Sequence, residues 1–154
     1  MPQSTFILHD SIELALARVL AANGDILANG HVQNMDTWRS SIERDEAYPP
    51  AVVTDSETFT NDAGAAGWPL YIGSVYVHVV TNKSDDPDAT TCKTMGQAVF
   101  AVINGATFAA DMNAELTDTG ITYHGATCEP GTNGELDGDN WNEVGWTLTV
   151  RCQQ

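Results

Sequence analysis

Two segments of the chain alternate hydrophobic and polar positions with the period of a β-strand. In residues 70–82 both alternating sets are largely apolar, a pattern typical of a strand with both faces covered. We therefore expect this strand to be central in a sheet. In residues 144–152 apolar positions alternate with glycine, threonine and arginine, which predicts a strand with only one buried face.

Two other segments carry the three- and four-residue spacing of a helix. Residues 10–22 open at Asp10, and Glu13 three residues later completes the spacing of a capping box. Asn23-Gly24 then ends this helix. Residues 89–104 repeat the apolar spacing after an acidic turn that favours a helix start. We expect both helices to cover the apolar face of the sheet.

Proline and glycine mark the remaining boundaries. Pro49-Pro50 leads into a strand at residues 51–59, which forms a hairpin with the central strand across an extended loop near residues 61–68. A third strand at residues 121–124 and a loop at residues 129–143 precede the last strand. The chain thus contains two predicted hairpins separated by a helix.

Residues 25–47 allow two local interpretations. A short strand could form around Asn29-Gly30, and a short helix could begin near Asp36 or Thr37. With either, the length of 154 residues and the order of elements predict one α+β domain over residues 1–154. We expect an antiparallel or mixed sheet of about four strands in two hairpins, covered on one face by two helices.

Acidic residues dominate the charge of the chain. It has 21 Asp and Glu residues against 6 Lys and Arg residues, a formal net charge of -15 and a pI near 4.2. Binding to phosphate backbones requires cationic side chains, so direct nucleic-acid binding is disfavoured. An acidic surface is mainly a means of solubility, although one that faces DNA would also repel it.

Cysteine usage and hydropathy exclude two further classes. The three cysteines are widely spaced and form no Cys-x-x-Cys pair, which argues against a disulfide framework or a zinc knuckle. No apolar run approaches the roughly 20 residues that span a bilayer. The first ten residues lack the basic flank and apolar run of a signal peptide. We therefore expect no membrane partner and no export.

The sequence lacks the motifs of several enzyme classes. It contains neither Gly-x-Ser-x-Gly nor a glycine-rich phosphate loop. His78 and His124 lie on predicted strands and could meet as a metal pair, but ordinary sheet positions are favoured because a metal needs a third ligand. The acidic loop around Asp137 and Asp139 fails the calcium-loop template. We predict no enzyme activity and no catalytic, cofactor-binding or metal-binding residue.

The order of these segments resembles that of one known family. The shared features are the amphipathic helix at residues 13–20, the acidic approach at 42–47, the aromatic-Pro-Ala-Val entry at 48–53, the strand at 73–80, the Pro-Asp turn at 86–88, the aromatic-Gly strand at 123–125 and the closing strand at 146–150. In this layout the chain resembles the tail terminator (tail completion) proteins of long-tailed bacteriophages, the family that includes the minor tail protein U of phage lambda. The resemblance covers nearly the whole chain.

The resemblance implies a structural role in the virion. Members of the family form a hexameric ring at the head-proximal end of the tail tube, stop tube growth and present a surface to the head completion proteins. The same partners, a location in the tail after assembly in the host cytoplasm, and the passage of DNA without specific binding are implied here. Another head-tail connector, a tail tube subunit and a monomeric acidic binding module are the alternatives.

Two groups of residues are candidates for these roles. Acidic residues around the entry to the 51–59 strand would face the channel and repel DNA, and aromatic residues flanking strands would be buried by a partner or packed on their own fold. The candidate channel-facing residues are Glu43, Asp45, Glu46, Asp55 and Glu57. The candidate subunit or partner contacts are Trp68, Tyr71 and Trp141.

Overall fold

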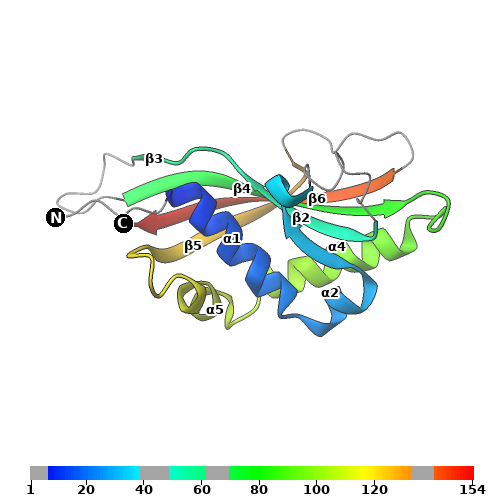
Figure 1. Ribbon diagram of the computed structural model, residues 1–154, viewed down its shortest axis with the longest axis horizontal. Coiled ribbons are helices and arrows are strands. Elements are labelled where there is room, and N and C mark those ends of the chain that lie inside the picture. The colour runs from blue at the N-terminus through cyan, green and yellow to red at the C-terminus, as the bar shows by residue number, and fades with distance from the viewer. Residues whose placement is uncertain (1–6, 39–48, 62–69, 133–140) are drawn as a thin grey trace.

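A mixed sheet with helices on one face organises the computed structural model, which describes residues 7–38, 49–61, 70–132 and 141–154 (Figure 1). The strand order is β1-β2-β4-β6-β5, and β3 pairs with β4. The strands are β1 His31–Asn34, β2 Ala51–Ser56, β3 Thr60–Asn61, β4 Leu70–Asn82, β5 Thr122–Pro130 and β6 Trp141–Gln153. The predicted α+β class and mixed sheet are confirmed, with β1 and β3 added to the four expected strands.

Strands β4 and β6 form the long central ribbon of the sheet. They pair antiparallel along their whole lengths, from Leu70 opposite Gln153 to Asn82 opposite Trp141. β2 flanks β4 and β5 flanks β6, both antiparallel, while β1 joins β2 in parallel. The expectation of a central strand at residues 70–82 is confirmed, as are both hairpins.

The helices of the described chain pack mainly on one face of this sheet (Figure 1). They are α1 Leu8–Ala21, α2 Gly24–Asn29, α4 Thr90–Ile103 and α5 Phe108–Glu115. α1 and α4 confirm the two predicted helices, and α2 and α5 extend the layer. In the described ranges no helix has both the length and the apolar character needed to cross a bilayer.

Apolar side chains fill the space between the helices and the sheet. α1 contributes Ile12, Leu16 and Leu20, and the sheet contributes residues such as Val77, which is fully buried. Leu148 of β6 lies in the same cluster. Burial of apolar surface is the main force that holds α1 and α4 on the sheet.

A second, smaller cluster lies on the opposite face of the sheet. A helical turn at residues 35–38 brings Trp38 over Val53 and Val80, and Trp38 is 1% exposed. Trp141 packs edge-on against it, with ring centroids 5.4 Å apart. This face is therefore partly covered as well.

The predicted start of α1 is wrong in its details. The helix begins at Leu8, and the residue before it, Ile7, makes no side-chain cap. Glu13 does not form a capping box with Asp10, because its side chain is buried against β2. Asn23 follows α1 but acts as the cap of α2, where its Oδ1 accepts a hydrogen bond from the Ile26 N–H at 3.1 Å.

The described part of residues 25–47 contains both a helix and a strand, but at positions other than those predicted. The expected strand around Asn29-Gly30 is displaced, because residues 24–29 form helix α2 and the strand follows at His31–Asn34. The short helix near Asp36 corresponds to the turn at residues 35–38, which the Asn34 side chain caps at the Thr37 N–H.

The loops are shorter than expected where they are described. The third strand continues to Pro130, and β6 already begins at Trp141, so the predicted loop at residues 129–143 is largely strand at both ends. Asn61 belongs to β3, and residues 62–69 and 133–140 lie outside the described residues.

Asp86 connects the start of α4 to strands β4 and β6 through hydrogen bonds. Its carboxylate accepts hydrogen bonds from the Thr81 hydroxyl at 2.8 Å and from the Cys92 N–H at 3.0 Å, and its carbonyl accepts one from Asn142 Nδ2 at 2.6 Å. Burial works to raise the pKa of Asp86, but the hydrogen bonds from Cys92 and Thr81 hold it below its ordinary value. The acidic turn thus serves the helix start, as the sequence indicates.

Candidate functional site

Carboxylates from several elements gather beside the end of β2. The last β1–β2 pair is Asn34 with Thr54, so the following residues of β2 extend beyond β1. α1 and the helical turn at residues 35–38 both approach this end of the strand. Around Glu13 lie Asp10, Asp36 and Asp55, and we define the acidic patch as these four residues together with the exposed Glu57, which follows Asp55 by two positions in the chain.

Glu13 is the buried member of the acidic patch. Its side chain is 6% exposed, and its Oε1 accepts a hydrogen bond from Ser56 Oγ at 2.9 Å. Burial raises the pKa of Glu13 to about 7, and the nearby charges of Asp55, Asp10 and Asp36 add to the rise, whereas the Ser56 hydrogen bond opposes it. Near neutral pH this carboxyl is therefore only partly ionised.

The raised pKa of Glu13 makes the stability of the fold depend on pH. The pKa is about 7 in the folded chain against 4.5 for the ordinary group, so the folded state binds the proton more tightly. The stability that this group contributes is complete below pH 4.5 and is lost as the pH rises through 7. Above that pH the ionised carboxylate is buried beside like charges.

Replacing Glu13 with glutamine should remove this pH dependence. One pKa unit corresponds to about 1.4 kcal/mol, and solvent screening reduces the full shift, so Glu13→Gln is expected to be about 1–2 kcal/mol more stable than wild type at pH 8. At pH 4 the two should match. Urea unfolding at both pH values measures this, with Glu57→Gln as an exposed control from the same patch. A stability difference that is the same at pH 4 and pH 8 would contradict the assignment.

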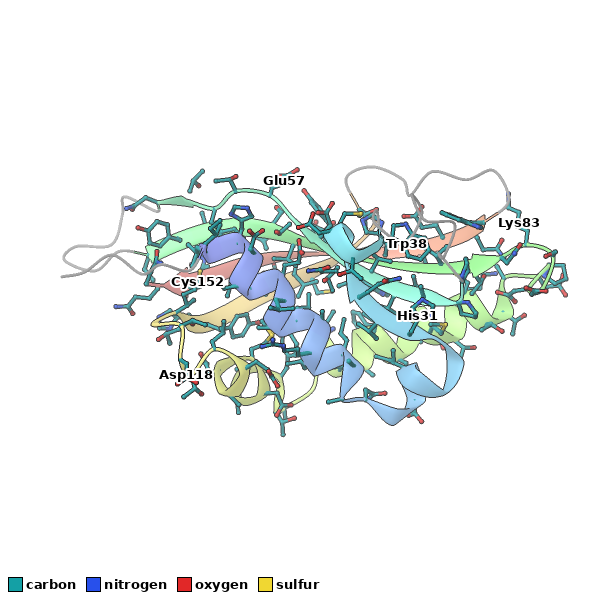
Figure 2. The ribbon with its side chains drawn as sticks, viewed as in Figure 1. His31, Trp38, Glu57, Lys83, Asp118 and Cys152 are labelled. Atoms are coloured by element: carbon teal, nitrogen blue, oxygen red, sulfur yellow. The ribbon has the colours of Figure 1, made fainter. Side chains whose placement is uncertain are left out.

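Two of the predicted channel-facing residues belong to the acidic patch. Asp55 is half-buried on β2, where its Oδ1 accepts a hydrogen bond from the Ser56 N–H at 2.9 Å. Glu57 is exposed and lies at the margin of the molecule away from α5 (Figure 2). Glu43, Asp45 and Glu46 lie outside the described residues. The structure thus adds Asp10, Glu13 and Asp36 to a patch of which the sequence indicated part.

The predicted aromatic contacts are partly covered by the fold itself. Tyr71 is half-buried and packs against the main core, and Trp141 is half-buried against Trp38. Trp68 lies outside the described residues. The roles of Tyr71 and Trp141 in subunit contacts stay predictions.

A buried hydrogen bond between two side chains, which the sequence did not indicate, joins the two central strands. His78 Nδ1 of β4 lies 2.6 Å from Glu143 Oε1 of β6, on the face opposite the helical layer. His78 is 2% exposed, and the β4–β6 register places it opposite Gly145. Within the described ranges its Nε2 has no hydrogen-bond partner, and neither has Trp38 Nε1. Because His78 is shielded from solvent, we interpret its contact with Glu143 as a structural one that holds β4 and β6 together.

The hypothesis of a metal pair between His78 and His124 is wrong. His124 is exposed, and its Nε2 lies 3.1 Å from Gln153 Oε1 near the C-terminal end of β6. His78 faces Gly145, near the other end of that strand. β6 separates β4 from β5, so the two histidines do not meet. Among the described side chains no group of three or more metal-ligating residues is found.

One open groove lies on the outer surface of the helical layer. It has a volume of about 310 Å³ and sits where the ends of α1 and α4 meet the start of α5. Val19 and Val102 contribute apolar lining, and Asp111 contributes a carboxylate. Its size is at the lower limit of ligand sites in proteins.

Comparison with known proteins adds no assignment to these features. No family model matches the chain, and no curated protein is similar to it in sequence. Function is therefore inferred from the geometry of the molecule and from the resemblance in layout.

Proposed function

We propose that this chain is a tail terminator: a structural virion protein that forms a ring at the head-proximal end of a phage tail tube. In this role it ends tube polymerisation and provides the surface that joins the tail to the head. The observation that carries the proposal is the order of elements, in which α1, the β2–β4 hairpin, α4 and the β5–β6 hairpin follow one another in one sheet-and-helix domain. The resemblance to tail terminators rests on that order.

The acidic patch gives the proposal a physical basis. A ring through which DNA passes must not retain it, and carboxylates repel phosphates over about one Debye length, near 10 Å at moderate salt. Asp55 is half-buried, and Glu57 is exposed at the margin of the domain (Figure 2). If this margin lines the channel, the net charge of -15 has a role beyond solubility.

Electron microscopy of the purified protein separates the proposed role from its closest alternative. A terminator is expected to form closed rings that do not stack at high concentration. Tubes of stacked rings would instead identify a tail tube subunit and contradict the proposal.

A further inference from the structure

Strand β5 lies at the edge of the sheet. Its outer backbone groups have hydrogen-bond partners in the described structure only near its N-terminal end. Asn113 of α5 takes the place of a neighbouring strand there: its Nδ2 donates to the Tyr123 carbonyl at 3.0 Å, and its Oδ1 accepts from the Tyr123 N–H at 2.8 Å. The pairing with β6 then shifts register at Gly125, which has a φ of 148°. Beyond this bulge no backbone hydrogen bond to the outer edge is found among the described residues.

The open part of this edge offers peptide groups to another strand. The Gly131 N–H donates to the Gly145 carbonyl at 2.7 Å, so Gly131 directs its backbone towards β6. In an antiparallel strand, the backbone N–H and C=O groups of successive residues point alternately towards one neighbour and towards the other. The backbone polar groups of Pro130, Cys128 and Ala126 therefore point outwards, away from β6. Proline has no N–H, which leaves Ala126 and Cys128 as both donors and acceptors at this edge.

The same residues form an apolar strip on the helix-covered face. Pro130, Cys128 and Ala126 stand opposite Trp146, Leu148 and Val150 of β6. Ala126 and Pro130 are exposed, and Cys128 and Trp146 are half-buried. We define the β5 strip by its members, which are Phe100, Ala126, Cys128, Pro130 and Trp146.

Two aromatic rings make the β5 strip rigid and prominent. Phe100 of α4 is 40% exposed, although it is a large apolar residue, and its ring centroid lies 4.8 Å from that of Trp146. The Trp146 ring is held in place by α4, because its Nε1 donates a hydrogen bond to the Gly96 carbonyl at 2.9 Å. Fixed aromatic side chains beside a strand edge are typical anchors of protein contacts.

We propose that the β5 strip is the surface on which a second copy of this chain adds a strand to the sheet. This inference rests on the proposed ring and names one side of its subunit interface. Copies that each carry a net charge of -15 repel one another, and the β5 strip contains no ionisable carboxylate. Contact between copies is therefore favoured here over the acidic margin.

A ring also needs a second surface on each subunit for the other side of that contact. A ring is built from head-to-tail contacts between two different surfaces of each subunit. β1 ends the sheet on the side away from β5, and strand edges pair with strand edges. Each copy thus contributes the β5 strip to one neighbour and a different surface to the other.

The test compares two variants of the β5 strip with a matched control by sedimentation velocity. Phe100→Glu places a charge on the strip, and Ala126→Pro removes an outward N–H without removing a hydrogen bond to β6. Both are expected to weaken ring assembly at least about tenfold, in line with the loss of an anchor at an interface. Leu14→Glu, at a 39% exposed position on α1, should leave assembly unchanged.

The outcomes separate the interface from the ring itself. Wild-type rings that persist in both strip variants, with folding verified by circular dichroism, would overturn the interface and leave the proposed function standing. A monomeric wild-type protein would overturn both. Rings that persist but fail to join heads would assign the strip to a different protein, which also overturns the second-copy proposal.

Discussion

Replacement of His78 by alanine is expected to lower the free energy of unfolding by about 3 kcal/mol, because it truncates a side chain that is 2% exposed and removes its hydrogen bond to Glu143. The pair joins β4 and β6 through the 2.6 Å contact between His78 Nδ1 and Glu143 Oε1. The Glu143 side chain is 19% exposed and has a further interaction, so most of the loss comes from the space that the His78 ring leaves in the buried site.

Urea or thermal unfolding measures this loss. A domain of this size loses about 2–4 °C of melting temperature per kcal/mol, so His78→Ala should melt about 6–12 °C below wild type. The matched control is His124→Ala, because His124 is exposed and its change should cost under about 0.5 kcal/mol. Equal and small losses in the two variants would mean that the His78–Glu143 pair does not hold the central ribbon together.

If the chain forms the proposed ring, charge reversal in the acidic patch is expected to slow the passage of DNA through it. Asp55→Lys combined with Glu57→Lys converts a surface that repels phosphates into one that attracts them, so ejection from phage particles should slow several-fold. Single-particle ejection assays measure the rate, and the effect should diminish at high salt.

The control for this variant changes the net charge by the same amount elsewhere. Asp88 and Asp118 are exposed, and Asp118 lies beside α5, away from Glu57 (Figure 2). Asp88→Lys with Asp118→Lys should therefore leave ejection unchanged. Assembled particles that eject DNA at the wild-type rate despite reversal of Asp55 and Glu57 would remove these two residues from the channel.

Local sequence patterns predicted the elements well, because side-chain periodicity reports which faces of a segment are buried. The central strand at residues 70–82 and the helices α1 and α4 are examples. The tertiary contacts were not accessible in this way. Glu13 has the spacing of a capping residue, yet the fold buries it against Ser56 of β2.

Contacts that depend on strand register were also missed. Glu143 meets His78 only because β4 and β6 pair along their full lengths, and nothing in either segment fixes that register. Asn113 closes the edge of β5 at Tyr123 through contacts between residues ten positions apart. The sequence therefore indicated part of the acidic patch, but it indicated neither the His78–Glu143 hydrogen bond nor the open strand edge.

Assembly into a closed ring is the central claim, and the mass of the purified protein in solution tests it most directly. Size-exclusion chromatography with light scattering should give one species at a fixed multiple, expected to be six, of the 16.5 kDa chain mass, and it should not grow further with concentration. A species that stays at 16.5 kDa at every concentration would contradict the account.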